Sequence, residues 1–139
     1  MVRMVNDMDN NLVDLNARIT MSWLENDQGT LRRRFANLPL EIDTIYMFPL
    51  NWTIIHRIDA GSPLYGKSRE NLVDASTEFL LMVRGYDNTY AKAVHANRSY
   101  TCQDLIYGAS FLPMYETRNK KTILHLHKIH DIKELELED

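Results

Sequence analysis

Alternating apolar and polar residues predict a β-strand at Val13–Trp23. Apolar side chains occupy every second position and polar side chains lie between them: Val13, Leu15, Ala17, Ile19, Met21 and Trp23. This period of two is typical of a strand with one buried face and one solvated face. The polar segment Glu25–Gly29 then predicts a hairpin loop, because Asn, Asp and Gly tolerate positive φ. A returning strand begins with Leu31, Arg33 and Phe35.

The middle of the chain continues this pattern of short strands and turns. A further strand with a shared face is predicted by Trp52, Ile54, His56 and Ile58, followed by a loop at Asp59–Gly61 and a turn at Ser62–Pro63. Ser68–Ala75 predicts a short helix capped by Ser68, with Leu72 and Val73 packed against the domain. The apolar run Glu78–Arg84 is too short to span a membrane and predicts a central strand that ends at Gly85.

The remainder predicts more strands at about 90–96, 104–107, 110–115 and 122–128, with a polar turn at Arg118–Lys121. The acidic segment Glu134–Asp139 is expected to be a frayed helix or disordered. Short strands with frequent turn signals favour an all-β sandwich with one or two short helices. The length of 139 residues fits one domain, residues 1–139.

Composition narrows the function. A net charge of −3 argues against nucleic acid as a partner, which a basic surface would favour. The single cysteine, Cys102, excludes an internal disulfide and is expected to pack as a small buried side chain. No run of residues approaches the ~18 apolar positions of a membrane span.

Candidate chemistry is sparse. The sequence lacks a G-x-S-x-G motif, an H-E-x-x-H motif and a glycine-rich phosphate loop, so no enzyme activity is expected. His125, His127 and His130 form H-x-H-x-x-H, and on one strand His125 and His127 could approach a single zinc ion. The alternative is a polar strand face followed by a structural His130, and the expected metal content is none. Arg32–Arg34 is expected to form a solvated or ion-pairing face.

Residues Asn51–Tyr65, NWTIIHRIDAGSPLY, carry the most specific signal. Together with Ser99-Tyr100, Tyr107-Gly108 and Phe111-x-Pro113, this segment resembles the cytoplasmic domain of inwardly rectifying potassium channels, the prokaryotic members most of all. The resemblance runs from about Arg3 to Ile132. It implies an immunoglobulin-like β-sandwich without a cofactor, at the cytoplasmic face of the cell membrane. It also implies a homotetramer attached to the transmembrane pore domain of the same full-length chain, and a place among voltage-gated channels.

The resemblance also implies roles for single residues. Asp14 matches an acidic position that faces the vestibule, where four carboxylates would concentrate potassium ions and attract magnesium or polyamines. Glu41 and Asp43 fall near another vestibule loop, and Arg84 stands where many relatives carry a second acid. The loop that narrows the ion path is matched by four residues: Gly85, Tyr86, Ala91 and Lys92.

An alternative function remains open at this point, that of a stand-alone β-sandwich module that binds another protein through an edge strand. It predicts the same fold without a pore domain.

Overall fold

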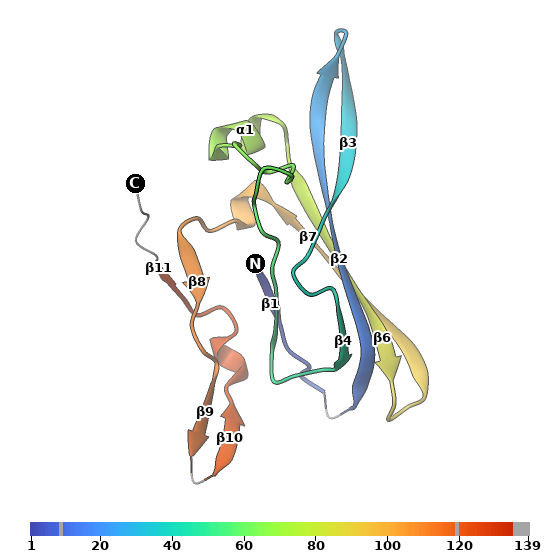
Figure 1. Ribbon diagram of the computed structural model, residues 1–139, viewed down its shortest axis with the longest axis vertical. Helices are drawn as coiled ribbons and strands as arrows, with labels where there is room; N and C mark the ends of the chain where they lie inside the picture. Colours follow the sequence, from blue (N-terminus) through green and yellow to red (C-terminus); the bar gives the residue numbers. More distant parts are fainter. Residues whose placement is uncertain (9, 119, 135–139) are drawn as a thin grey trace.

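The computed structural model describes residues 1–8, 10–118 and 120–134. Its largest element is an antiparallel five-stranded sheet in the order β3–β2–β6–β7, with β4 pairing β2 beside the start of that strand (Figure 1). The bounds of its strands are β2 Leu12–Asp27, β3 Thr30–Leu38, β4 Thr44–Met47, β6 Glu78–Asp87 and β7 Lys92–Thr101. The sequence of β2 accounts for its central place, because its alternation supplies one continuous apolar face.

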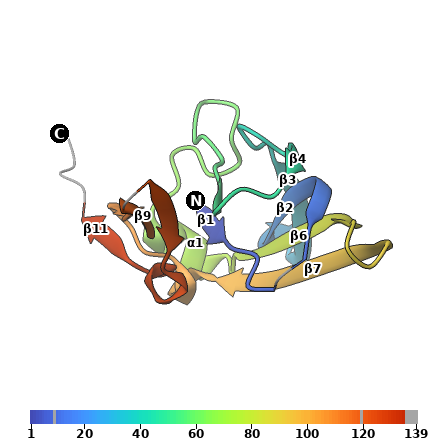
Figure 2. The same cartoon turned by 90° about the horizontal axis from the view of Figure 1, so that it is seen from below.

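In the described part of the chain, three two-stranded sheets accompany the large sheet, and β1 and β9 lie on one side of it in Figure 2. The pairs are β1 Val2–Met4 with β5 Trp52–Ile54, β8 Ala109–Phe111 with β11 Ile132–Glu134, and β9 Tyr115–Arg118 with β10 Lys121–Leu124. Among the described residues, helical structure is limited to α1 Arg69–Asp74 and the 3₁₀ turns η1 Cys102–Asp104 and η2 Leu126–Lys128. The predicted all-β sandwich with few short helices is confirmed.

The core lies between the large sheet and these smaller pieces. Its buried members come from both layers: Leu15, Ala17, Ile19, Met21, Leu38, Trp52, Ile54, Leu72, Phe79, Leu81 and Cys102. The buried Cys102 thiol donates to Thr77 O at 3.4 Å, which confirms its predicted packing role. On β6 the opposite face is open, since Leu80 is 37% and Met82 49% exposed. The apolar run is a central strand as predicted, with only one face buried in the described chain.

Several predicted boundaries were wrong. β5 ends at Ile54, because the His56 ring lies 2.6 Å from Pro39 O through Nδ1 and 2.7 Å from Ser62 Oγ through Nε2. These contacts hold His56 against a loop carbonyl and a loop hydroxyl, and Ile58 is exposed. Gly85 does not end β6, which continues to Asp87. Residues 104–107 form no strand, since the chain turns at η1 instead.

The helix α1 begins where the sequence predicts. Ser68 Oγ accepts a hydrogen bond from Asn71 N at 3.2 Å, and Asn71 Oδ1 accepts one from Ser68 N at 3.0 Å, a reciprocal cap. Leu72 is buried as expected, whereas Val73 is exposed. A helix of six residues presents only one face to the core, and Val73 lies on the other face. Of the predicted acidic tail, Glu134 belongs to β11, and residues 135–139 lie outside the described chain.

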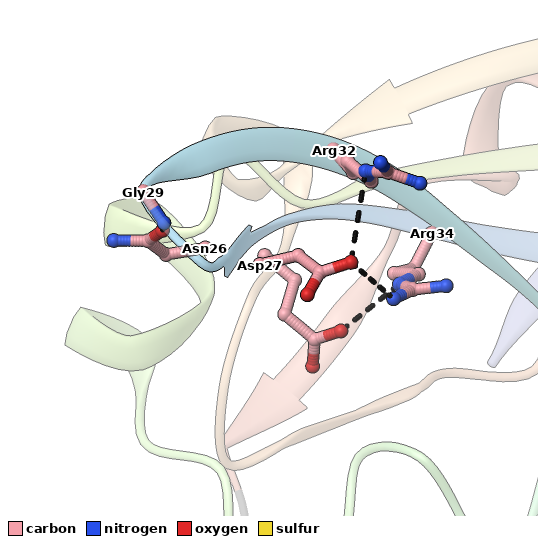
Figure 3. A network of polar contacts seen from close by, with 6 residues as sticks. Asn26, Asp27, Gly29, Arg32 and Arg34 are labelled. Atoms are coloured by element: carbon pink, nitrogen blue, oxygen red, sulfur yellow. Dashed lines mark hydrogen bonds and ion pairs between the residues drawn. The ribbon is translucent and has the colours of Figure 1, made fainter.

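The β2–β3 hairpin is tighter than its sequence predicts, because its turn consists of Gln28 and Gly29 alone. Both have positive φ, 52° and 84°, as a two-residue type I′ turn requires. Arg32 and Arg34 form an ion-pairing face, one of the two predicted alternatives, with acids of the opposite strand (Figure 3). Arg32 Nε lies 3.6 Å from Asp27 Oδ2, and Arg34 Nε lies 3.0 Å from Glu25 Oε2. These exposed pairs contribute little, about 0.2–1 kcal/mol each.

Arg3 joins the first strand to the last third of the chain. Its guanidinium donates to Lys128 O at 2.7 Å, to Ile129 O at 2.8 Å and to Leu112 O. The same group lies 4.4 Å from the centre of the Phe111 ring, a cation–π contact. One side chain therefore satisfies carbonyls of loops that the β8–β11 ladder leaves free.

Candidate functional site

Asp14 lies on a β-bulge at the start of β2. Val13 pairs with Tyr86 and Asn16 with Arg84, so the two residues Asp14 and Leu15 stand opposite the single residue Gly85. Asp14 takes up the extra residue with a left-handed φ of 52°. Its carboxylate is exposed and makes no hydrogen bond or ion pair with the described residues. A bulge thus presents an unneutralised acid at one end of the sheet.

Gly85 is required by close packing at this bulge. An added Cβ would lie 3.1 Å from Leu15 Cγ and 3.3 Å from Val13 O, closer than nearly all real Cβ contacts. Leu15 itself is buried in the core, so it has little room to retreat. The glycine therefore permits the bulge, which in turn sets the position of Asp14.

The loop from β6 to β7 is fixed by Asp87, which sequence analysis missed. Asp87 Oδ2 accepts from Asn10 Nδ2 at 2.9 Å, and Oδ1 accepts from the N–H groups of Thr89 at 2.9 Å and Tyr90 at 3.1 Å. The bond from Asn10 is the largest influence lowering the pKa of this carboxyl below its usual value, helped by the two N–H donors and opposed by burial. The signal was available, because Asp-Asn-Thr after a strand is typical of a side-chain-capped turn.

A second pair of contacts holds the same loop to the segment before β2. Asn88 N donates to Asn11 O and Asn11 N donates to Thr89 Oγ1, both at 2.8 Å. Ala91 closes the turn with a positive φ of 53°. Lys92 follows as the first residue of β7, with its ammonium 5.7 Å from the Tyr90 ring centre. The predicted narrowing loop is therefore a short turn over 88–91, while Gly85 and Tyr86 belong to strand β6.

The remaining predicted site residues, Asp43, Arg84 and Glu41, do not all lie at the same end of the large sheet. Asn16 of β2 pairs with Thr44 of β4 on one side and with Arg84 of β6 on the other. Asp43 directly precedes Thr44, so it lies two strands from Arg84. Ala17 N donates to Asp43 O at 2.8 Å, which fixes that loop to β2. Glu41 instead pairs with Arg57, Oε1 to Nη2 3.2 Å. The structure thus brings Asp14, Asp43 and Arg84 to one end of the sheet and places Glu41 against another loop.

The histidine hypothesis rested on a strand that the structure does not contain. β10 ends at Leu124, and the 3₁₀ turn η2 starts at Leu126, so His125 and His127 do not share a strand face. Their rings meet edge to face at 5.5 Å, and His125 Nε2 lies 3.1 Å from Glu116 Oε1. His130 is exposed in a turn. In the part of the chain that the structure describes, no three metal-ligating side chains gather.

Comparison with known proteins decides what kind of domain carries this surface. Residues 1–138 match the family described as the inward rectifier potassium channel C-terminal domain. The chain belongs to this family. Inward rectifier potassium channel Kirbac3.1 of Paramagnetospirillum magnetotacticum is 31% identical over 134 residues, 95% of this chain and 45% of that protein.

Animal relatives match a shorter part of the chain. ATP-sensitive inward rectifier potassium channel 12 of Mus musculus is 32% identical over 83 residues, 58% of this chain and 19% of that protein. Inward rectifier potassium channel 4 of Mesocricetus auratus is 29% identical over 82 residues, 57% of this chain and 18% of that protein. The chain therefore spans less than half the length of the curated relatives that it matches.

Membership of the inward rectifier C-terminal domain family confirms the resemblance found in the sequence and identifies a family of channel domains that are not enzymes. It does not support a place among voltage-gated channels, because inward rectifiers are not voltage-gated. Among the described residues, no helix is long and apolar enough to cross a bilayer.

Proposed function

We propose that this chain is the cytoplasmic domain of an inward-rectifier potassium channel and lines the intracellular ion path as a homotetramer. In the full-length protein it is attached to the transmembrane pore domain and lies at the cytoplasmic face of the membrane. The family match to residues 1–138 supports this function over that of a stand-alone interaction module.

The exposed, unpaired Asp14 is the observation that carries the proposal. A carboxylate without a neutralising partner keeps its full charge for passing ions, and four copies around one axis add their potentials. Potassium would be concentrated there, and magnesium or a polyamine would be held more strongly because it carries more charge. Asp43 adds to this field, Arg84 reduces it, and Glu41 contributes less because Arg57 pairs with it.

The turn over 88–91 is proposed to be the narrow part of the path. It is short, and it is held by Asp87 and by Asn11. Ala91 at its end carries the smallest side chain that a non-glycine residue can have, which suits four loops meeting at an axis. Because its hydrogen bonds to Asn11 tie the turn to the segment before β2, the turn would move when that segment moves.

The test uses a chimera in which this chain replaces the matched 45% of the bacterial relative. Potassium flux into liposomes is measured with increasing internal magnesium or spermine. Asp14→Asn is expected to weaken block several-fold, with the effect declining as salt rises. Asp74→Asn, an exposed acid on α1, is the matched control and should leave block unchanged. Equal block in the parent chimera and in Asp14→Asn would remove Asp14 from the ion path.

A further inference from the structure

The sheet around Asp14 has two free lateral edges. At this end the strands run β4–β2–β6–β7, and Asp14 and Arg84 lie on the two middle strands. In both Figure 1 and Figure 2, β4 and β7 lie on opposite sides of that middle pair. If the middle strands face a common axis, which rests on the proposed function, neighbouring copies have to meet at the lateral edges.

β7 is a long and unprotected edge. It has ten residues, and within the described chain it pairs only with β6. Edges of this length are normally shortened, covered or bulged, because their free N–H and C=O groups invite other chains. Its charged side chains are all basic, Lys92 and Arg98, with His95 between them. The edge is thus open and carries positive charge.

The opposite edge has the complementary character. β4 pairs only with β2 among the described strands, and three large apolar residues of this edge are more than half exposed: Ile42 60%, Tyr46 73% and Met47 57%. The segment 41–47 carries the acid Asp43 and no basic residue, while its second acid, Glu41, is paired with Arg57. An apolar, acidic edge therefore stands across the sheet from a basic one.

We propose that β7 of one copy packs against the segment 41–47 of the next copy. The contact joins two different surfaces, so it is heterologous and closes into a ring rather than a two-fold dimer. Opposite charges on the two edges favour this pairing over β7 with β7, where basic residues would face each other. The same contact would cover the exposed edge of β7 and bury the apolar side chains that β4 leaves in water.

The test places a single cysteine on each of the two edges. His95→Cys and Tyr46→Cys are made in a Cys102→Ala background, purified apart, and treated with a short bismaleimide either alone or mixed. The expected result is a covalent dimer in the mixture and little in either variant alone. Val73→Cys, an exposed site on α1, replaces Tyr46→Cys in the control mixture, which should stay uncross-linked.

Light scattering on the same samples separates this contact from the tetramer itself. If the chain is a tetramer but the mixed sample gives no more covalent dimer than the Val73→Cys control, the proposed contact is overturned and the proposed tetramer stands. Cross-linking of His95→Cys with itself would overturn it in favour of a symmetric β7 pair. A chain that stays monomeric and uncross-linked at the highest concentration would overturn both the contact and assembly of the isolated chain.

Discussion

Gly85→Ala should destabilise the domain because the bulge at Asp14 leaves no space for a Cβ. The added atom would lie 3.1 Å from Leu15 Cγ and 3.3 Å from Val13 O, so side chain or backbone must shift. Such overpacking costs about 1–3 kcal/mol. The smaller entropy of the unfolded alanine chain recovers about 0.4–1 kcal/mol. Taken at their mid-points, these two effects leave a net loss of about 1.3 kcal/mol.

This loss is measured by urea unfolding followed by tryptophan fluorescence. Gly61→Ala is the control, because the added Cβ there would meet only Asp59 Oδ1, at an ordinary contact distance of 3.5 Å. Adding Leu15→Ala makes a double-mutant cycle. If Leu15 is the obstacle, Gly85→Ala should cost less in the Leu15→Ala background than in the parent. A loss below about 0.3 kcal/mol in the parent, within the usual error of such comparisons, would refute the packing argument.

Two further predictions concern buried polar groups. Thr77 Oγ1 is buried and has no hydrogen-bond partner among the described residues, so Thr77→Val should leave stability unchanged or raise it by about 1 kcal/mol in urea unfolding. A loss of stability above that amount would show that the hydroxyl is paired. The lowered pKa of Asp87 means that its stabilisation is fully present above the unfolded pKa of about 3.9 and is lost as pH falls through the lower folded value. Acid unfolding should therefore be less steep below pH 4 in Asn10→Ala, and identical profiles would contradict the role of that bond.

Local patterns predicted the parts of the fold that local physics determines. The alternation of β2, the cap at Ser68 and the burial of Leu72 follow from side-chain periodicity and from one hydrogen-bond acceptor at a helix start. The boundaries that failed depend on distant partners. His56 leaves its strand because Pro39 and Ser62 bond its ring, and no window around His56 contains Pro39.

The candidate site was predictable in part for the same reason. Asp14 and Gly85 were found through family resemblance, yet their direct opposition depends on a bulge that no local pattern indicates. Asp87 was accessible from the residues that follow it, since Thr89 and Tyr90 supply two of its three donors. Its third donor, Asn10, is 77 residues away, so the link between the turn and the start of β2 needed the structure.

The contacts of Arg3 have a consequence for the order of folding. Its bonds to Lys128 and Ile129 close loops of 125 and 126 residues, nearly the full length of the chain. Contacts of such sequence separation form late, because loop closure must be offset by structure already in place. During synthesis the first strand leaves the ribosome long before its carbonyl acceptors exist. β1 can therefore reach its final contacts only after residue 129 has emerged, so the first strand of this domain is among the last to be secured.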